Sequence, residues 1–231
     1  MAALKPDRLL TLSARKHLLR MVRTKDLRHG FPDELPLMER IAEQGMRFSS
    51  GAENLAMATI ASDMHSGLME SPGHRANILS SQYDTIGVAV MKTGNEYWAT
   101  QHFVRSTPQL SAADAEATFI RFVQQGRKSS RLPRLRIESN DEVRAAVCKM
   151  AKGDQLKANE LPDEERLSRW SEGIGHAQRG AYAFTSLDLK DWPENLRSVL
   201  SNPNLERMYV GACFVSTRKL PGGAYWFGVL F

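Results

Sequence analysis

Three side chains in the first half of the chain have the types and surroundings of a chemical site. His29 opens the run His-Gly-Phe-Pro, Glu53 lies in Gly51-Ala-Glu-Asn-Leu, and His74 lies in Ser71-Pro-Gly-His-Arg-Ala-Asn-Ile-Leu. Each run contains glycine or proline, which indicates a loop. Two imidazoles and one carboxylate can form an open Zn²⁺ site, whose bound water would be acidified for hydrolysis.

The same residues also fit a structural role. Glu53 could accept backbone N–H groups and hold two loops together, with both imidazoles hydrogen-bonded nearby. The three residues are far apart in the sequence, and no histidine pair has the spacing of a helical metal site. A Zn²⁺ site at His29, Glu53 and His74 and a purely structural carboxylate therefore both stay open. Spacing suggests no partner for His102, and His17 is expected to be a packed core residue.

Composition excludes several classes of function. With 42% hydrophobic and 25% charged residues, the chain has the composition of a folded globular protein rather than a disordered one. No run of eighteen apolar residues occurs, so we expect no membrane span. The net charge of +5 is scattered along the chain. The densest basic stretch, residues 127–136, has no interleaved aromatic residue, so we expect no nucleic-acid partner.

The chain contains two cysteines, Cys148 in a helical pattern and Cys213 in an apolar strand. Two such residues are expected to be buried small side chains rather than a disulfide framework. Residues 1–7 carry charge where the apolar core of a signal peptide would begin, so no signal peptide is predicted.

Hydrophobic periodicity predicts the elements that position the candidate residues. Two apolar runs, residues 86–91 and 97–104, read as strands of a hairpin joined by Lys92-Thr-Gly-Asn95. Helices are predicted before and between the candidate loops, at residues 7–24, 33–45, 59–68 and 75–79. Helices around a small antiparallel sheet predict an α+β fold with α/β/α layers.

The second half of the chain repeats this order of features. Residues 4–17 align with residues 135–148 at a spacing of 131, and residues 86–90 align with residues 210–214. Gly51 to Leu55 align with residues 180–184, which puts Tyr182 at the position of Glu53. The chain is therefore predicted to be a tandem duplication, with domains at residues 1–106 and 107–231. The second copy keeps only His176 and looks degenerate.

The second copy begins with a segment that has no counterpart in the first. Ala115, Phe119 and Val123 recur at helical spacing after the candidate N-cap Asp114. The first copy starts at Met1, just ahead of Leu4. We therefore expect the first copy to lack its opening helix.

The Glu53 and His74 runs, followed by the strand Ile86-Gly-Val-Ala, resemble the CAP superfamily (cysteine-rich secretory proteins, antigen 5, pathogenesis-related 1) in its bacterial SCP-like form. The resemblance covers residues 4–104. It implies tandem CAP-like α/β/α sandwiches and an extracellular or periplasmic location. It also implies a cleft lined by His29, Glu53, Asn54, Ser71 and His74. The sequence departs from the family at Leu68, where Trp is usual, and at Ser71, near which the family's second acid would fall.

The resemblance implies a non-enzymatic protein that binds a lipid or sterol, a cell-surface polymer or a protein partner in this cleft. One alternative is a metal-assisted hydrolase that uses His29, Glu53 and His74, with Glu53 as ligand or general base. Another alternative is a protein-interaction module whose surface is provided by the second copy.

Overall fold

The computed structural model describes residues 3–152, 181–189 and 192–231. The chain divides into a first unit, Met1–Thr107, and a second unit, Pro108–Phe231. Each unit contains one four-stranded sheet and helices. The α+β fold class expected from the sequence is confirmed. None of the helices in the described part of the chain is long and apolar enough to cross a bilayer.

The sheet of the first unit is built around a long hairpin. β3 (Thr85–Thr93) and β4 (Glu96–Ser106) pair antiparallel, and Gly94 supplies the positive φ that their turn requires. β2 (Phe48–Ala58) pairs antiparallel with β4, and the short β1 (Lys5–Pro6) lies parallel to β3. The strand order is β1-β3-β4-β2.

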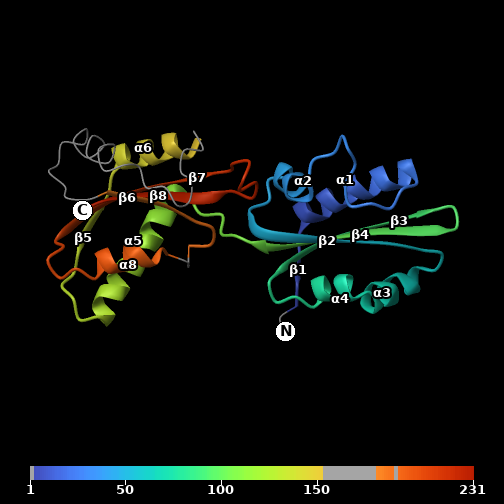
Figure 1. Ribbon diagram of the computed structural model, residues 1–231, viewed down its shortest axis with the longest axis horizontal. Helices are drawn as coiled ribbons and strands as arrows, with labels where there is room; N and C mark the ends of the chain where they lie inside the picture. The colour runs from blue at the N-terminus through green and yellow to red at the C-terminus, as the bar shows by residue number, and fades with distance from the viewer. Residues whose placement is uncertain (1–2, 153–180, 190–191) are drawn as a thin grey trace. The chain divides into compact units, whose positions relative to one another are not determined.

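The helix α1 (Arg8–Thr24) covers one face of this sheet. It begins after Asp7, whose carboxylate accepts the Leu10 N–H at 2.9 Å, and it ends at Lys25 in the left-handed region. α1 packs very closely on β3, because a Cβ added to Gly87 would lie 2.3 Å from the backbone carbon of Leu10. α2 (Leu37–Glu43) lies on the same face, while α3 (Ala61–Glu70) and α4 (Pro72–Ile78) cover the other (Figure 1).

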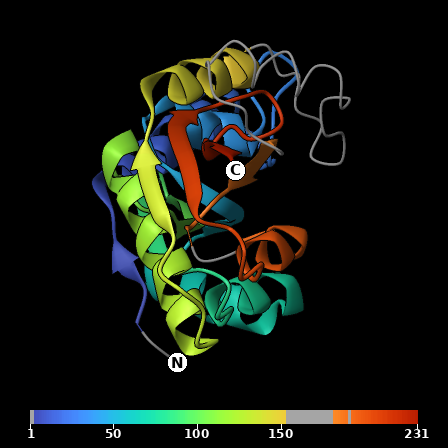
Figure 2. The same cartoon turned by 90° about the vertical axis from the view of Figure 1, so that its left-hand side faces the viewer.

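The second unit repeats the sheet of the first. β5 (Arg136–Ser139), β6 (Ala181–Ser186), β7 (Arg207–Val215) and β8 (Ala224–Leu230) have the order β5-β7-β8-β6. Figures 1 and 2 show α6 (Asp141–Lys152) on one face and α5 (Ala112–Ser129) with α8 (Glu194–Leu200) on the other. The core is aromatic, with Phe184 stacked on Phe227 at 5.2 Å between ring centroids.

Matching hydrogen bonds define which positions of the two units correspond. The Asp7 N–H donates to the Ile86 carbonyl, and the Asn140 N–H donates to the Val210 carbonyl, each at 2.9 Å. Gly211 also lies against the backbone of α6, as Gly87 lies against α1. The spacing between the two helices is therefore 133 residues, from 140 − 7, and not the 131 expected from the sequence.

Strand pairing also corrects the expected equivalent of Glu53. Glu53 pairs with His102, which pairs with Gly87, and Ala183 pairs with Gly228, which pairs with Gly211. The position of Glu53 is therefore taken by Ala183 and not by Tyr182. A shift of one residue along a strand moves a side chain to the other face of the sheet, so the two assignments are not interchangeable. His176 lies outside the described residues.

Candidate functional site

Glu53 lies in the middle of β2, and not in a loop as its sequence suggested. Gly51 is the reason for the difference. A Cβ at this position would lie 3.1 Å from the Phe103 carbonyl oxygen, so the glycine permits close packing rather than a turn. Side chains alternate along a strand, and Glu53 therefore points toward α1 and α2 while Asn54 points toward α4.

The Glu53 carboxylate is buried, and nitrogen atoms surround it. Its side chain is 2% exposed. Oε1 lies 2.9 Å from His29 Nδ1, and Oε2 lies 2.7 Å from His102 Nε2 and 3.0 Å from an Arg40 guanidinium nitrogen. His17 Nε2 lies 3.8 Å from Oε2. The carboxylate thus connects β4, α1, α2 and the loop that carries His29.

A second carboxylate extends this network. Glu34 lies 2.9 Å from His17 Nδ1 and 3.4 Å from Arg40. His17 Nε2 faces the Arg28 carbonyl at 2.9 Å, and Arg40 donates to the His29 carbonyl at 3.0 Å. Both nitrogens of His17 therefore face acceptor oxygens. We call His17, His29, Glu34, Arg40, Glu53 and His102 the Glu53 cluster.

Two residues of the cluster, Glu53 and His102, have pKa values below their ordinary values. Burial alone would raise the pKa of Glu53, but the hydrogen bond from His102 and the charge of Arg40 outweigh it and lower this pKa. Burial also lowers the pKa of His102, against the opposing effect of Glu53. A neutral His102 that donates from Nε2 leaves Nδ1 as a buried acceptor, and this atom has no hydrogen-bond partner among the described residues.

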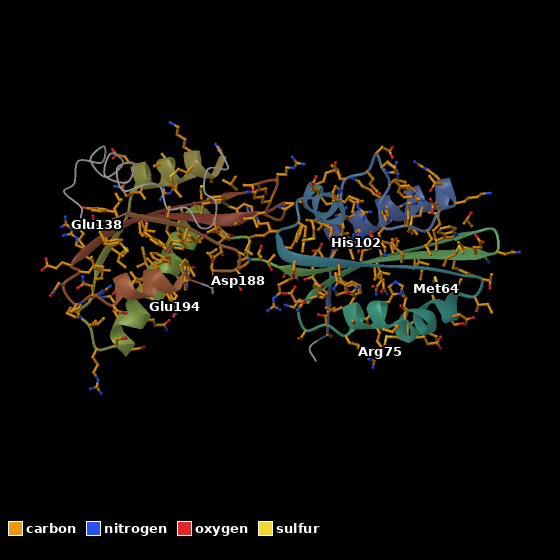
Figure 3. The ribbon with its side chains drawn as sticks, viewed as in Figure 1. Met64, Arg75, His102, Glu138, Asp188 and Glu194 are labelled. Carbon is orange, nitrogen blue, oxygen red and sulfur yellow. The ribbon has the colours of Figure 1, made fainter. Side chains whose placement is uncertain are left out.

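The remaining residues expected in the cleft lie on the other side of the sheet. The buried Asn54 donates to the His74 carbonyl and to Gln101 at 3.1 Å, and accepts from Asn77 at 2.8 Å. His74 belongs to α4, and Ser71 is the residue just before that helix. Figure 3 shows His102 on the α1–α2 side of the sheet and Arg75, also in α4, on the opposite side.

The expected triangle is therefore only partly formed. The structure brings His29 and Glu53 together, but the imidazoles that join them are His17 and His102 rather than His74. The reason is the strand conformation at residue 53, because neighbouring residues of a strand point to opposite faces. A binding role for the expected residues stays a prediction.

Three residues of the cluster, Glu34, Arg40 and His102, were not found from the sequence, and His17 was expected there only as a packed core residue. Arg40 lies in a predicted helix, where its pattern looks like an ordinary surface arginine. His102 lies in a predicted strand, and its pairing with Glu53 is visible only once the register of β2 against β4 is known.

Comparison with known families finds one match to this chain. Residues 1–103 match the family model described as "CAP: Cysteine-rich secretory protein family". The match spans nearly all of the first unit, which we call the CAP domain from here on. No curated protein matches the sequence at a significant level.

Several solved structures are similar to the chain. An outer surface protein from Borrelia burgdorferi is 20% identical with a TM-score of 0.43, covering 46% of this chain and 80% of its own. An extracellular SCP-domain protein from Bacillus anthracis is 26% identical with a TM-score of 0.42, covering 46% of this chain and 35% of its own. Na-ASP-1 is 10% identical with a TM-score of 0.40, covering all of this chain and 80% of its own.

The side chains around Glu53 do not fit the Zn²⁺ site expected from the sequence. The Arg40 guanidinium lies 3.0 Å from Glu53 Oε2 and already neutralises the carboxylate, so a divalent cation there would meet a like charge. In the part of the chain that the structure describes, no group of three or more His, Cys, Asp or Glu side chains is arranged to hold a metal ion. We therefore derive no catalytic step through a metal.

A groove of about 500 Å³ runs between α1 and α2 on the outer side of the cluster. Arg40 and Glu34 belong both to its wall and to the Glu53 cluster. Leu35 is the one apolar residue among its lining side chains, and the others are charged or polar. The Glu53 cluster therefore holds in place two charged residues of an accessible polar groove.

Proposed function

We propose that the CAP domain is a non-enzymatic binding module that takes a polar cell-surface polymer in the α1–α2 groove. This proposal rests on one observation: Arg40 and Glu34 line the groove and also belong to the Glu53 cluster. A binding surface gains affinity when its polar groups are held in place before the ligand arrives, because less ordering is needed on binding.

A binding role fits Glu53 better than a catalytic one. Both carboxylate oxygens accept from nitrogen donors of His29, Arg40 and His102. A general base works best when its pKa lies near the working pH, whereas the pKa of Glu53 is lowered. Glu53 in this proposal is a buried anchor that positions its neighbours.

The composition of the groove favours a polar ligand over a lipid or sterol. Pockets for small apolar molecules are lined mainly by hydrophobic and aromatic side chains. The groove instead presents Lys16, Arg23 and Glu43 at its surface, with Leu35 as its apolar residue. An extracellular or periplasmic location, which the family resemblance implies, would bring the domain to such a polymer.

Charge reversal in the groove tests the proposal. Lys16→Glu together with Arg23→Glu should weaken binding of soluble peptidoglycan fragments or heparin by at least tenfold, measured by titration calorimetry on the full chain. The matched control is Arg8→Glu with Arg15→Glu, which makes the same charge change on exposed residues of α1 outside the groove lining.

The result depends on which probe is bound. Loss of polymer binding in the groove variant alone supports the proposal. Binding of phosphatidylglycerol or sterol vesicles without polymer binding would overturn it in favour of a lipid ligand. Equal weakening in both double variants would show a general charge effect and no groove site.

A further inference from the structure

A small pocket in the second unit lies between α5 and α8, which share one face of the sheet (Figures 1 and 2). Its volume is about 260 Å³. The apolar part of its lining consists of Phe122, Val123, Leu132 and Leu200. The polar part comes from arginine and serine residues, and none of the described residues that line the pocket is acidic.

Arg127 is a buried cation in this lining, and it is 2% exposed. Its Nε and Nη1 donate to the carbonyls of Pro133, Leu200 and Asn202 at 2.8, 2.8 and 3.0 Å. Nη2 contacts the Leu205 carbonyl at 3.4 Å. A guanidinium Nη atom carries a pair of N–H groups, so one N–H of Nη2 has no acceptor among the residues that the structure describes.

The Arg127 charge also has no carboxylate partner within the described part of the chain. Burial lowers the pKa of this guanidinium, and no neighbouring carboxylate opposes the effect. Buried charges in proteins are normally paired, because an unpaired one loses its hydration without compensation. An unpaired cation that lines a pocket therefore indicates an anionic ligand.

The ends of the two helices do not cancel this charge. Arg127 binds the carbonyl of Leu200, the last residue of α8, and so also caps that helix. A helix C-terminus carries roughly half a negative charge, so the ends of α5 and α8 together offset about one positive charge. Arg197 adds a second positive charge to the lining, with its guanidinium carbon 5.3 Å from the centre of the Phe122 ring. The pocket therefore keeps a net positive charge.

The donors of the pocket suit a phosphate group. Arg127 and Arg197 supply N–H donors, and Ser130 supplies a hydroxyl. Arginine is favoured wherever proteins recognise phosphate, and a phosphate monoester presents three acceptor oxygens. The densest basic stretch of the sequence, residues 127–136, thus contributes Arg127 and Ser130 to a pocket rather than forming a uniformly solvated surface.

We infer that this pocket binds a small molecule that carries one phosphate monoester group beside an apolar group. The phosphate accepts from Arg127 and Arg197, and the apolar group packs on Phe122 and Leu132. The volume of about 260 Å³ is just below the roughly 300 Å³ at which pockets for larger ligands begin, so the ligand is small. Every lining residue belongs to the second unit, so this inference is independent of the polymer-binding function.

Phenyl phosphate is the probe for this pocket, and titration calorimetry on the full chain measures its binding. We expect a Kd below about 1 mM. Arg197→Gln removes an exposed charge from the lining and should weaken binding by about tenfold or more. The matched control Arg121→Gln makes the same change on an exposed arginine of α5 outside the lining, and it should leave binding unchanged.

Gly126 allows a second test that removes no interaction of the folded chain. It lines the pocket, and a Cβ added there would meet no atom within 4 Å. Gly126→Glu should abolish binding of phenyl phosphate, because it places a negative charge in the pocket. Gly126→Gln has nearly the same size without the charge and should retain measurable binding.

Other outcomes overturn the inference. No binding of phenyl phosphate up to about 10 mM would show that the pocket takes no phosphate. Equal weakening by Arg197→Gln and Arg121→Gln would show a general charge effect, and equal loss in both Gly126 variants would show that charge is irrelevant. Phenylacetate binding as tightly as phenyl phosphate would assign the pocket to carboxylates. Binding of phosphatidic acid vesicles without binding of phenyl phosphate would assign it to a lipid headgroup.

Discussion

Truncation of Glu53 tests whether the cluster is the anchor of the CAP domain. Glu53→Ala would leave the Arg40 guanidinium, whose side chain is 8% exposed, without its carboxylate at 3.0 Å. Removing one partner of a buried ion pair costs about 3–5 kcal/mol, because the other charge stays buried. Glu34 remains 3.4 Å from Arg40 and compensates in part, so we expect a loss near 3 kcal/mol, roughly the low end of that range.

Hydrogen exchange of the full chain measures this loss within one unit. A loss of about 3 kcal/mol corresponds to roughly 100-fold faster exchange of β2 and β4 amides that open with the unit. Peptides of β7 and β8 serve as the internal reference. The control Glu43→Ala removes an exposed pair with Lys16 and should change stability by less than about 1 kcal/mol. Equal exchange in the two variants would refute the anchoring role of Glu53.

Three further results are expected. Acid should lower the free energy of unfolding of the CAP domain in two stages. The pKa of His102 is lowered in the folded state, so stability falls as the pH drops below the ordinary histidine pKa of 6.5, and the lowered pKa of Glu53 causes a further loss below the ordinary glutamate pKa of 4.5. Urea unfolding series at pH 8, 6 and 4 with exchange labelling measure both losses. Gly87→Ala should unfold or strongly destabilise the domain, because the new Cβ would meet the backbone of α1. The control Gly67→Ala, at a position in α3 where a Cβ meets no other atom, should be neutral or stabilising by up to about 1 kcal/mol. Thermal melts measure both. Burial raises the pKa of the Cys213 thiol, so iodoacetamide should modify it only after denaturation, as read by mass spectrometry.

The sequence predicted the elements whose pattern is local. The helix after Asp7 and the hairpin around Gly94 follow from hydrophobic period and turn chemistry, and both are confirmed. The cluster could be predicted only in part because it depends on which strands pair and in what register. His102 reaches Glu53 through a cross-strand pairing of residues 49 positions apart. Arg40 reaches it through the docking of a seven-residue helix, α2, whose direction no local pattern specifies.

Glu53 and Tyr182 were assigned wrongly for the same reason, because a nearby glycine was interpreted as a turn signal. Gly51 looks like a turn signal in the sequence, although its missing side chain makes room for Met38 and the Phe103 carbonyl. In the second unit the Gly-Ala pair at 180–181 suggests an alignment that strand pairing shifts by one residue, from Tyr182 to Ala183. Glycine in a strand often marks a close approach, and sequence alone does not separate that use from a turn.

The two units place their buried carboxylates in different parts of the same sheet topology. In the CAP domain Glu53 lies on a strand and ties the His29 loop and α2 to the sheet on the α1 face. In the second unit Ala183 replaces it, and Glu116 on the opening helix pairs with Arg144 at the sheet edge. A buried charge costs several kcal/mol unless it is paired, so each carboxylate commits its surroundings to one arrangement. The second unit uses its ion pair to hold α5 over the face of its sheet that carries Ala212.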